Sequence, residues 1–458
     1  MIKLILKYLP SIVIPTIASI ILTMIYGTNL SPDDYGFFSL FTTSISIVTV
    51  ILFNFMITTV LRFYRVKKEE NQHVTFFSTF LLTSFLITVI VFLVTSVFIG
   101  MKIGLLFSIS LLVSVFLSFY LNQMRSTDKH LTFNLFKAII PSLNVLFVLY
   151  LTYSNNLNMW TVIFAMYIPM SIVVVIYTVK TIKKSEIKFK YNIRELSNAA
   201  SYGFPLALAA MLNTVISGID RYIINFHLNN HSVGIYSFAY RIAELSMINL
   251  TLVIILALYP QLIKIHDTQG RARAEHTLNE YLKLHIIITI PFVILVWFYG
   301  EEIISLIFHD YVDSAKILKY MILGAFLLSL SYYTNKSFEL TKTNMIMVRL
   351  LALAALVNII LTWFLVPYYH LMGAIIATFV SYFVYVVFSI ISARNILKVH
   401  FPYKLFALVS AINIIIVFIF KSIINNPILI EICLSATIVI FINGVLGFIL
   451  YKRKVLNF

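Results

Sequence analysis

The sequence predicts an all-α polytopic membrane protein with about 14 transmembrane helices, arranged as two six-helix lobes and a C-terminal helix pair. Of its 458 residues, 60% are hydrophobic and only 11% are charged, whereas about a quarter of the residues of a soluble domain are charged. Apolar runs long enough to cross a bilayer recur along the chain and are joined by short polar segments. This composition excludes an ordinary soluble enzyme. The single cysteine, Cys433, excludes an internal disulfide framework.

The predicted spans form three groups. The N-lobe, residues 1–180, contains spans near 9–27, 37–61, 74–99, 103–123, 131–153 and 159–179. A basic cytoplasmic linker, residues 181–197, leads to the C-lobe. The C-lobe, residues 198–393, contains spans near 198–225, 234–262, 284–306, 316–338, 345–367 and 371–392. The C-terminal pair, residues 405–450, contains spans near 405–420 and 428–450.

Lysine and arginine predict the orientation, because short cytoplasmic loops of membrane proteins are enriched in these residues. If the N terminus lies inside, most of the 34 basic residues fall in the predicted cytoplasmic segments. The outer loops then hold only Lys102, Lys316, Lys319 and Lys421. Both termini are therefore expected to be cytoplasmic. The same distribution accounts for the net charge of +16 without a nucleic acid partner.

A short motif occurs once in each predicted lobe. Leu30-x5-Gly36-Phe37-Phe38-Ser39-Leu40 corresponds to Leu228-x5-Gly234-Ile235-Tyr236-Ser237-Phe238 at a constant offset of 198. The motif is either a common way for a chain to enter a membrane or the trace of a duplication. Its matching place, between the first and second spans of each lobe, favours duplication. Six spans return the chain to the same side, so the lobes would be parallel repeats.

The sequence indicates neither an enzyme nor a resident cofactor. Its longest hydrophilic segments, around 180–197 and 264–283, are basic and too short for a catalytic domain, and it contains no Walker motif. His227 and His231 have the i, i+4 spacing that can hold a metal on a helix. They flank Asn229-Asn230 with no carboxylate or third histidine nearby, so a polar turn is the favoured interpretation. We therefore expect no metal site.

The polar residues inside the predicted spans are the candidate functional residues, since ionisable groups are costly in a bilayer. In span 131–153, Asn134, Lys137, Pro141 and Asn144 share one helical face. Such a stripe favours a cavity over lipid. Lys137 is about two turns from the inner end, so its ammonium group could instead reach the headgroups. Arg349, in span 345–367, is expected to face the lobe interior.

The first two spans of the C-lobe carry two further sets of polar residues. Span 198–225 has Asn213, Ser217 and Asp220 on one face, followed by Arg221, and span 234–262 has Ser237, Arg241 and Glu244. Because these spans are consecutive, the two sets are expected at similar depth. They could form a structural ion-pair network, with Asp220 paired to Arg241 and Glu244 to Arg221, or a substrate site. A network that opens during transport would fulfil both roles.

Several segments resemble those of one transporter superfamily. They are Tyr202-Gly203-Phe204-Pro205-Leu206, Ile219-Asp220-Arg221-Tyr222-Ile223-Ile224, Val233-Gly234-Ile235-Tyr236-Ser237-Phe238-Ala239-Tyr240, Tyr259-Pro260, Ser31-Pro32-Asp33-Asp34-Tyr35-Gly36 and Met372-Gly373-Ala374-Ile375-Ile376-Ala377-Thr378. With the layout of six, six and two spans, they make the whole chain similar to the polysaccharide flippases of the multidrug/oligosaccharidyl-lipid/polysaccharide exporter superfamily. These motifs are diffuse, so they indicate the family better than the substrate.

The resemblance implies a two-lobe transporter of the bacterial plasma membrane that moves an undecaprenyl-diphosphate-linked oligosaccharide outward by alternating access. Its partners would be this glycan, membrane lipids, and a polysaccharide polymerase and glycosyltransferases. Substrate-binding roles are expected for Arg221, Arg241, Lys137, Arg349, Asn144 and Asn213. Asp220 or Glu244 would take a coupling H⁺ or Na⁺.

Three other functions remain open at this point. A drug exporter of the same superfamily would carry an acidic cation site in the first lobe, but spans one to six contain no Asp or Glu. A lipid II flippase shares the layout, but basic residues would be expected in its first span, and none follows Lys7 there. A membrane-embedded polysaccharide polymerase is the alternative from another class.

Overall fold

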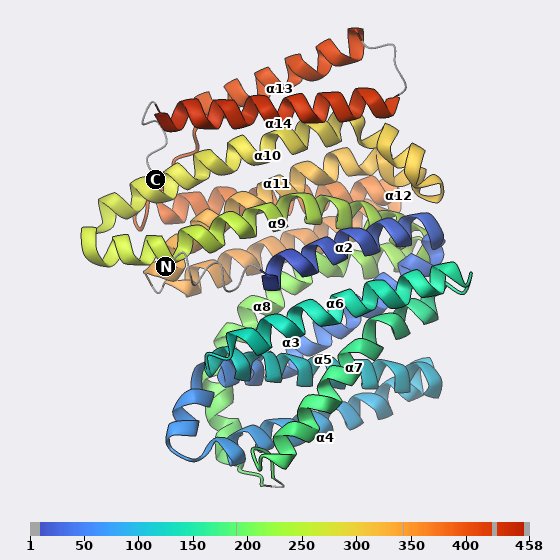
Figure 1. Ribbon diagram of the computed structural model, residues 1–458, viewed down its shortest axis with the longest axis vertical. Coiled ribbons are helices and arrows are strands. Elements are labelled where there is room, and N and C mark those ends of the chain that lie inside the picture. The colour runs from blue at the N-terminus through green and yellow to red at the C-terminus, as the bar shows by residue number, and fades with distance from the viewer. Residues whose placement is uncertain (1–9, 189, 342, 424–427, 453–458) are drawn as a thin grey trace. The chain divides into compact units, whose positions relative to one another are not determined.

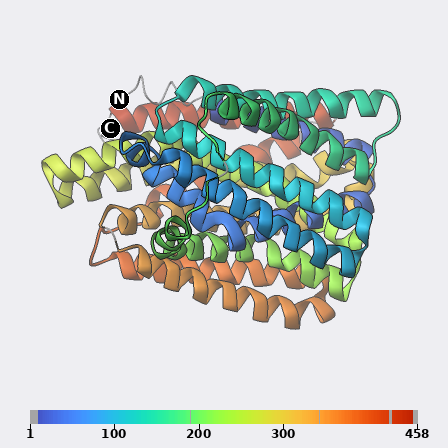
Figure 2. The same ribbon diagram turned by 90° about the horizontal axis from the view of Figure 1, so that it is seen from below.

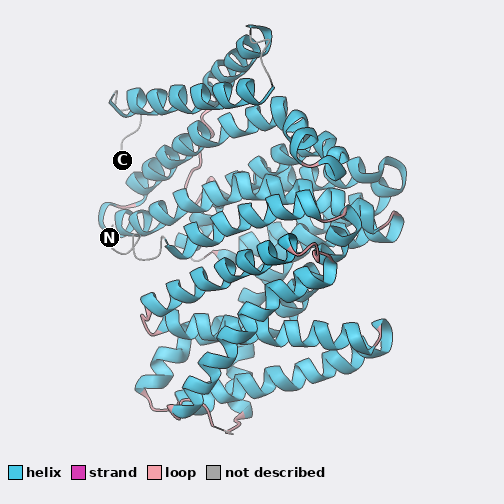
Figure 3. Ribbon diagram, turned by 45° about the vertical axis from the view of Figure 1, so that its right-hand side comes forward, coloured by secondary structure: helices cyan, strands magenta, loops and turns pink. Residues whose placement is uncertain are grey.

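The computed structural model describes residues 10–188, 190–341, 343–423 and 428–452, and within these ranges the chain is helical and contains no strand (Figures 1 and 3). The first helices are α2 (Pro10–Asn29), α3 (Pro32–Glu69), α4 (His73–Ile99), α5 (Met101–Ser126), α6 (His130–Tyr153), α7 (Met159–Lys183) and α8 (Ile193–His227). They are followed by α9 (Asn230–Gln269), α10 (Arg271–Ile307), η1 (His309–Tyr311), α11 (Val312–Leu340), α12 (Asn344–Ala393), α13 (Tyr403–Ile423) and α14 (Ile428–Lys452). The all-α fold class is confirmed.

Twelve helices of the described chain are long and apolar enough to cross a membrane, and α14 contributes a shorter apolar stretch, Ile432–Gly447. The predicted spans 345–367 and 371–392 both lie in the 50-residue α12. The chain reverses direction inside this element. His370 has non-helical backbone angles (φ 49°, ψ −132°), and a Cβ on Gly373 would lie 2.5 Å from the backbone of Leu365. The two arms of α12 therefore account for the two predicted spans.

Two helices continue well beyond the predicted spans. α9 has 40 residues and α10 has 37, which corresponds to about 55–60 Å at about 1.5 Å per residue, whereas a bilayer core is about 30 Å thick. They meet at Gly270, whose φ of 80° favours glycine. The hydrophilic segment 264–283 is thus built from helix ends, with no separate domain.

The chain forms two compact units, Ile2–Ile219 and Asp220–Phe458, and the division falls inside α8. The first part of α8 packs on α3 in the first unit. A Cβ on Gly203 would lie 2.2 Å from the carbonyl oxygen of Phe55, and Lys67 pairs with Glu195 at 2.8 Å. The lobe boundaries predicted from the sequence, at 180 and 198, stay a prediction.

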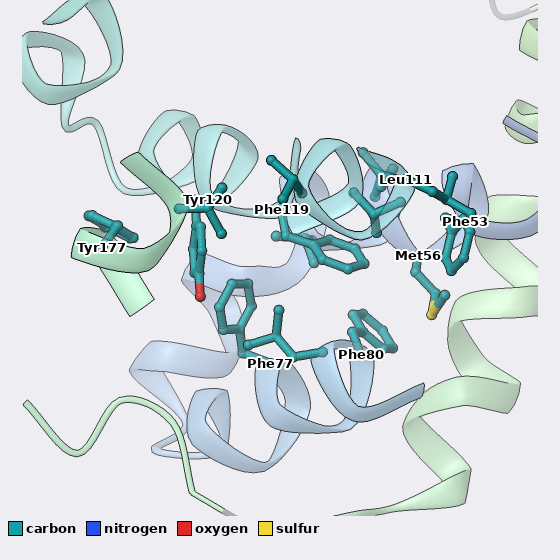
Figure 4. Packing of buried hydrophobic residues seen from close by; sticks show 14 of the residues in the cluster. Phe53, Met56, Phe77, Phe80, Leu111, Phe119, Tyr120 and Tyr177 are labelled. Atoms are coloured by element: carbon teal, nitrogen blue, oxygen red, sulfur yellow. The ribbon is translucent and has the colours of Figure 1, made fainter. Parts of the chain in front are cut away.

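Aromatic side chains form the core of the unit Ile2–Ile219 (Figure 4). Phe53, Phe77, Phe80 and Phe119 are fully buried there, which suits a bundle whose outer surface faces an apolar solvent. Figure 2 shows α3, α4, α5 and α6 with their axes roughly aligned, as expected of helices that cross one bilayer. This unit carries Lys137, Asn144 and Asn213 of the predicted site.

Candidate substrate and cation site

The repeated motif begins with the same local structure in both copies. The Ser31 side chain caps α3 and accepts a hydrogen bond from the amide of Asp34. The Asn229 side chain caps α9 and accepts one from the amide of Ser232 at 2.8 Å. Ser31 and Asn229 differ by the same offset of 198 as the sequence motif. This agreement of caps supports the predicted duplication.

The offset also shows where the two copies differ. The positions that correspond to Asp220, Arg221, Tyr236, Arg241 and Glu244 hold Leu22, Thr23, Phe38, Thr43 and Ser46. At the positions of Asp220, Arg221, Arg241 and Glu244, the first copy thus has uncharged side chains. The ionisable cluster is a feature of α8 and α9 alone, so a special function of this cluster would belong to the second repeat.

Asp220 and Arg221 form the buried centre of this cluster. The Asp220 carboxylate accepts a hydrogen bond from the hydroxyl of Tyr236 and another, at 2.9 Å, from the backbone amide of Arg221. The Arg221 guanidinium donates to Ser237 at 3.2 Å and lies 4.8 Å from the ring centroid of Tyr240. Both side chains are buried, so each depends on these contacts for compensation of its charge.

A chain of hydroxyl and amide groups continues from this centre into α12. The hydroxyls of Tyr236 and Thr378 are 3.3 Å apart, and the amide nitrogen of Asn358 donates to Thr378 at 3.4 Å. The carbonyl oxygen of Asn358 and the hydroxyl of Thr362 are buried and have no hydrogen-bond partner among the residues that the structure describes. Oxygen donors of this kind suit a proton or a hard monovalent cation.

Arg241 and Glu244 form a second, more accessible pair. Their charged groups are 3.0 Å apart, and their side chains are 39% and 37% exposed. Asp220 and Arg221, at 3.7 Å, form the other pair of the cluster. Both of these pairs join residues of one helix, whereas the network expected from the sequence joins α8 to α9. The link between α8 and α9 found here runs through Tyr236, Ser237 and Tyr240.

The remaining predicted site residues are spread over the two units. Lys137, Asn213 and Arg349 are exposed. Asn144 is buried, and its carbonyl oxygen has no partner within the described residues. The structure brings Asp220, Arg221, Arg241 and Glu244 together on α8 and α9, while Lys137, Asn144 and Asn213 belong to the other unit.

Two further polar sites lie outside this cluster. Lys336 and Glu339 form an ion pair of 2.6 Å at the end of α11, and the Lys336 ammonium lies 4.3 Å from the ring of Tyr259. His227 packs against Trp363 with ring centroids 4.8 Å apart. Among the described residues, no group of three metal-ligating side chains occurs.

Sequence reasoning overlooked the phenol and hydroxyl groups of the cluster. Tyr236 and Tyr240 have the same i, i+4 spacing as Ser237 and Arg241, and Asn358 and Thr362 repeat it in α12. That spacing places each pair on one helical face. It is the signal that could have predicted their involvement.

The comparison with protein families matches residues 29–317 to the family described as Polysaccharide biosynthesis protein. This match covers more than half of the 458 residues. The chain belongs to this family. No curated protein matches it in a sequence search.

Solved structures share the fold of this family member. A lipid II flippase, MurJ, in an inward closed conformation has a TM-score of 0.77 at 18% identity, with 100% of both chains covered. An inward-facing multidrug resistance transporter of the MATE family and MOP superfamily has a TM-score of 0.69 at 12% identity, covering 84% of this chain and 97% of its own. A MOP superfamily transporter from Pyrococcus furiosus has a TM-score of 0.58 at 13% identity, covering 86% and 95%. The fold is therefore the all-α fold seen in these MurJ and MATE transporter structures.

Proposed function

We propose that this polysaccharide biosynthesis protein is a flippase that moves undecaprenyl-diphosphate-linked oligosaccharide across the bacterial plasma membrane by alternating access. The observation that carries the proposal is the family match over residues 29–317 on a transporter fold. A transporter fold in a polysaccharide biosynthesis family implies cargo that is made on one side of the membrane and used on the other. Lipid-linked glycan is cargo of that kind.

The physical chemistry of such a substrate requires protein groups inside the membrane. A sugar diphosphate would lose the hydrogen bonds of its water shell in hydrocarbon, which costs several kcal/mol per polar group. Half-exposed Arg241 and exposed Lys137 and Arg349 can meet the diphosphate. Exposed Asn213 can offer its amide group to the sugars, whereas Asn144 is buried and could reach them only after a rearrangement. Arg221 is buried, so its contact with substrate requires a rearrangement of the cluster.

Asp220 is the proposed site of a coupling cation. Its carboxylate is buried and lies at the end of the oxygen-rich chain formed by Tyr236, Thr378 and Asn358. A proton or Na⁺ there would neutralise a charge that is costly in the membrane. Glu244 is the second candidate, and its larger exposure makes exchange with water easier.

A lipid II flippase is the second candidate function, because MurJ matches over the whole length of both chains. The cation-coupled drug exporter is less well supported, since the ionisable cluster belongs to the second repeat and the family concerns polysaccharide. A membrane polysaccharide polymerase would need a catalytic constellation, for which the sequence offers no candidate.

Transport assays with purified protein in liposomes distinguish these functions. The protein should move fluorescent undecaprenyl-diphosphate oligosaccharide between leaflets, and lipid II more slowly. Movement of lipid II alone would make the second candidate correct. Joining of repeat units without movement would identify a polymerase. Imposed H⁺ or Na⁺ gradients test the coupling, with Asp220→Asn as the variant that should lose it.

The cellular setting is part of the same proposal. Both termini are proposed to be cytoplasmic, and glycosyltransferases that build the lipid-linked glycan and a polymerase that consumes it would act before and after the flippase. Cysteines introduced near either terminus of a Cys433→Ser protein should react with membrane-impermeant reagents only in inverted vesicles. Labelling in intact cells would instead indicate that the termini lie outside.

A further inference from the structure

Three connecting segments of the unit Ile2–Ile219 meet at one end of its helices. They are the α3–α4 turn, the α5–α6 turn and the chain that follows α7. Arg65, near the end of α3, pairs with Asp128 in the α5–α6 turn at 2.9 Å. The chain after α7 lies on α4, where the backbone amide of Lys188 donates to the hydroxyl of Ser78 at 3.0 Å. In the proposed orientation, this end of the unit lies at the cytoplasmic surface of the membrane.

Four lysines of these segments form what we call the lysine cluster: Lys68, Lys129, Lys180 and Lys184. Lys129 is half-buried, and the other three side chains are exposed. Burial lowers the pKa of the Lys129 ammonium most, Glu186 raises it, and the other three lysines of the cluster lower it further. The five charged groups therefore lie near one another, although they come from three separate parts of the chain.

The acids of the same segments do not neutralise the lysine cluster. Of the five acids there, four contact Arg65 or Lys67, namely Glu69, Glu70, Asp128 and Glu195. Glu186 is the fifth, and it faces all four lysines of the cluster. Four positive charges and one negative charge leave a net charge of +3. Among the residues that the structure describes, the cluster thus has a large excess of positive charge.

A cytoplasmic location alone does not require such a cluster. The enrichment of lysine in cytoplasmic loops orients a membrane protein, but it does not need the lysines of different loops to lie together. Like charges that are brought together repel each other, and the burial of Lys129 removes part of the water that would screen this repulsion. A bound anion would turn the repulsion into attraction.

We propose that the lysine cluster binds the phosphate headgroup of an anionic phospholipid of the cytoplasmic leaflet. Groups of four to eight basic residues directly beside transmembrane helices attract such lipids. Exposed apolar side chains lie within about a turn of the lysines on the same helices, namely Val66 on α3 and Val179 and Ile182 on α7. A ligand with a phosphate and acyl chains matches both kinds of surface, whereas a soluble anion matches only the lysines. The inference is independent of the transported substrate.

Lipid binding to the full-length protein in neutral detergent, measured by native mass spectrometry, tests the proposal. The probes are phosphatidylglycerol, phosphatidylcholine with the same acyl chains, and glycerol 3-phosphate. Phosphatidylglycerol should bind at least about tenfold more tightly than either of the others. Lys129→Gln combined with Lys180→Gln should remove most of this preference. Lys264→Gln combined with Lys404→Gln is the matched control, because it removes two exposed lysines of the other unit, and it should keep the preference.

Three results would overturn the lipid site. One is equal binding of phosphatidylglycerol and phosphatidylcholine. Another is an equal loss of preference in both double variants, which would mean a general attraction to the basic surface. The third is binding of glycerol 3-phosphate as tight as that of phosphatidylglycerol, which would identify a site for soluble anions. If Lys129→Gln with Lys180→Gln does not fold, Lys68→Gln with Lys184→Gln, which changes only exposed side chains, should show the same loss. None of these measurements involves the glycan, so their failure would leave the proposed function intact.

Discussion

The carboxylate of Asp220 lies 3.7 Å from the guanidinium of Arg221, its neighbour in the chain, and both side chains are buried. Adjacent residues of a helix normally point in different directions. Here the guanidinium is also held by Ser237 at 3.2 Å and by the ring of Tyr240. The pair is thus fixed by contacts from α9 as well as by its own attraction.

Arg221→Met should destabilise the protein strongly, because it leaves the Asp220 carboxylate buried without its counter-charge. The expected loss in the free energy of unfolding is about 3–5 kcal/mol. Asp220→Asn combined with Arg221→Met removes both charges and should cost less than Arg221→Met alone. Thermal unfolding of detergent-solubilised protein measures both. If the double variant were less stable than Arg221→Met, the two buried charges would not be compensating each other.

The Arg241–Glu244 pair provides a comparison for stability and a test for function. Because both side chains are more than a third exposed, Arg241→Ala should change stability by less than about 1 kcal/mol. Arg241→Ala also removes a charged hydrogen-bond donor, and this should slow flipping by about tenfold or more. Transport in liposomes measures the rate. Lys316→Ala, which removes an exposed lysine paired with Asp313, should transport normally, and equal rates for both variants would exclude Arg241 from the substrate path.

The exposed residues Lys137 and Arg349 can be tested in cells that depend on the protein. Lys137→Ala and Arg349→Ala should each reduce surface polysaccharide if these cations meet the diphosphate, and Lys137→Arg should retain it because the charge is kept. Immunoblots of the polymer provide the measurement, with protein level as the control. Full polymer in Lys137→Ala would indicate that this lysine only reaches the headgroup region.

Much of the fold follows from the sequence because membrane spans have a strong and simple signal. Hydrocarbon solvent requires about 20 apolar residues per span, so even the reversal near His370, inside the 50-residue α12, falls between the predicted spans 345–367 and 371–392. Charge patterns are weaker guides. They indicate which side chains are costly to place in the membrane, but not which groups each side chain contacts. The contact of Arg221 with Ser237 and Tyr240 depends on packing between helices, which no sequence spacing specifies.

The ends of helices are also hard to predict from hydropathy. Hydropathy falls at the polar segment 264–283, but backbone hydrogen bonding does not, so α9 and α10 continue through it to Gly270. Which helices pack against each other is equally hard to predict from the sequence. The approach of Gly203 to the backbone of Phe55 depends on which helices are neighbours, and the sequence shows only that Gly203 belongs to a conspicuous motif.

Gly203→Ala should loosen the packing of α8 on α3. The added Cβ would lie 2.2 Å from the Phe55 carbonyl oxygen, so one backbone must move, at a cost of about 1–3 kcal/mol. Gly444→Ala is the matched control, because its Cβ meets no atom within 4 Å and alanine favours helix more than glycine does. Melting temperature should fall for the first variant and stay equal or rise for the second. Equal effects of the two would contradict the close approach.

His370→Gly should stabilise the protein. Its φ of 49° with ψ of −132° belongs to a region that side chains with a Cβ avoid and glycine enters readily, and such strain costs about 1–3 kcal/mol. Glycine also loses more entropy on folding, so the net gain expected is about 1 kcal/mol. Asn155→Gly is the control, since asparagine tolerates its φ of 54° and should gain less. A lower melting temperature for His370→Gly would mean that the histidine ring stabilises the turn by more than its backbone strain costs.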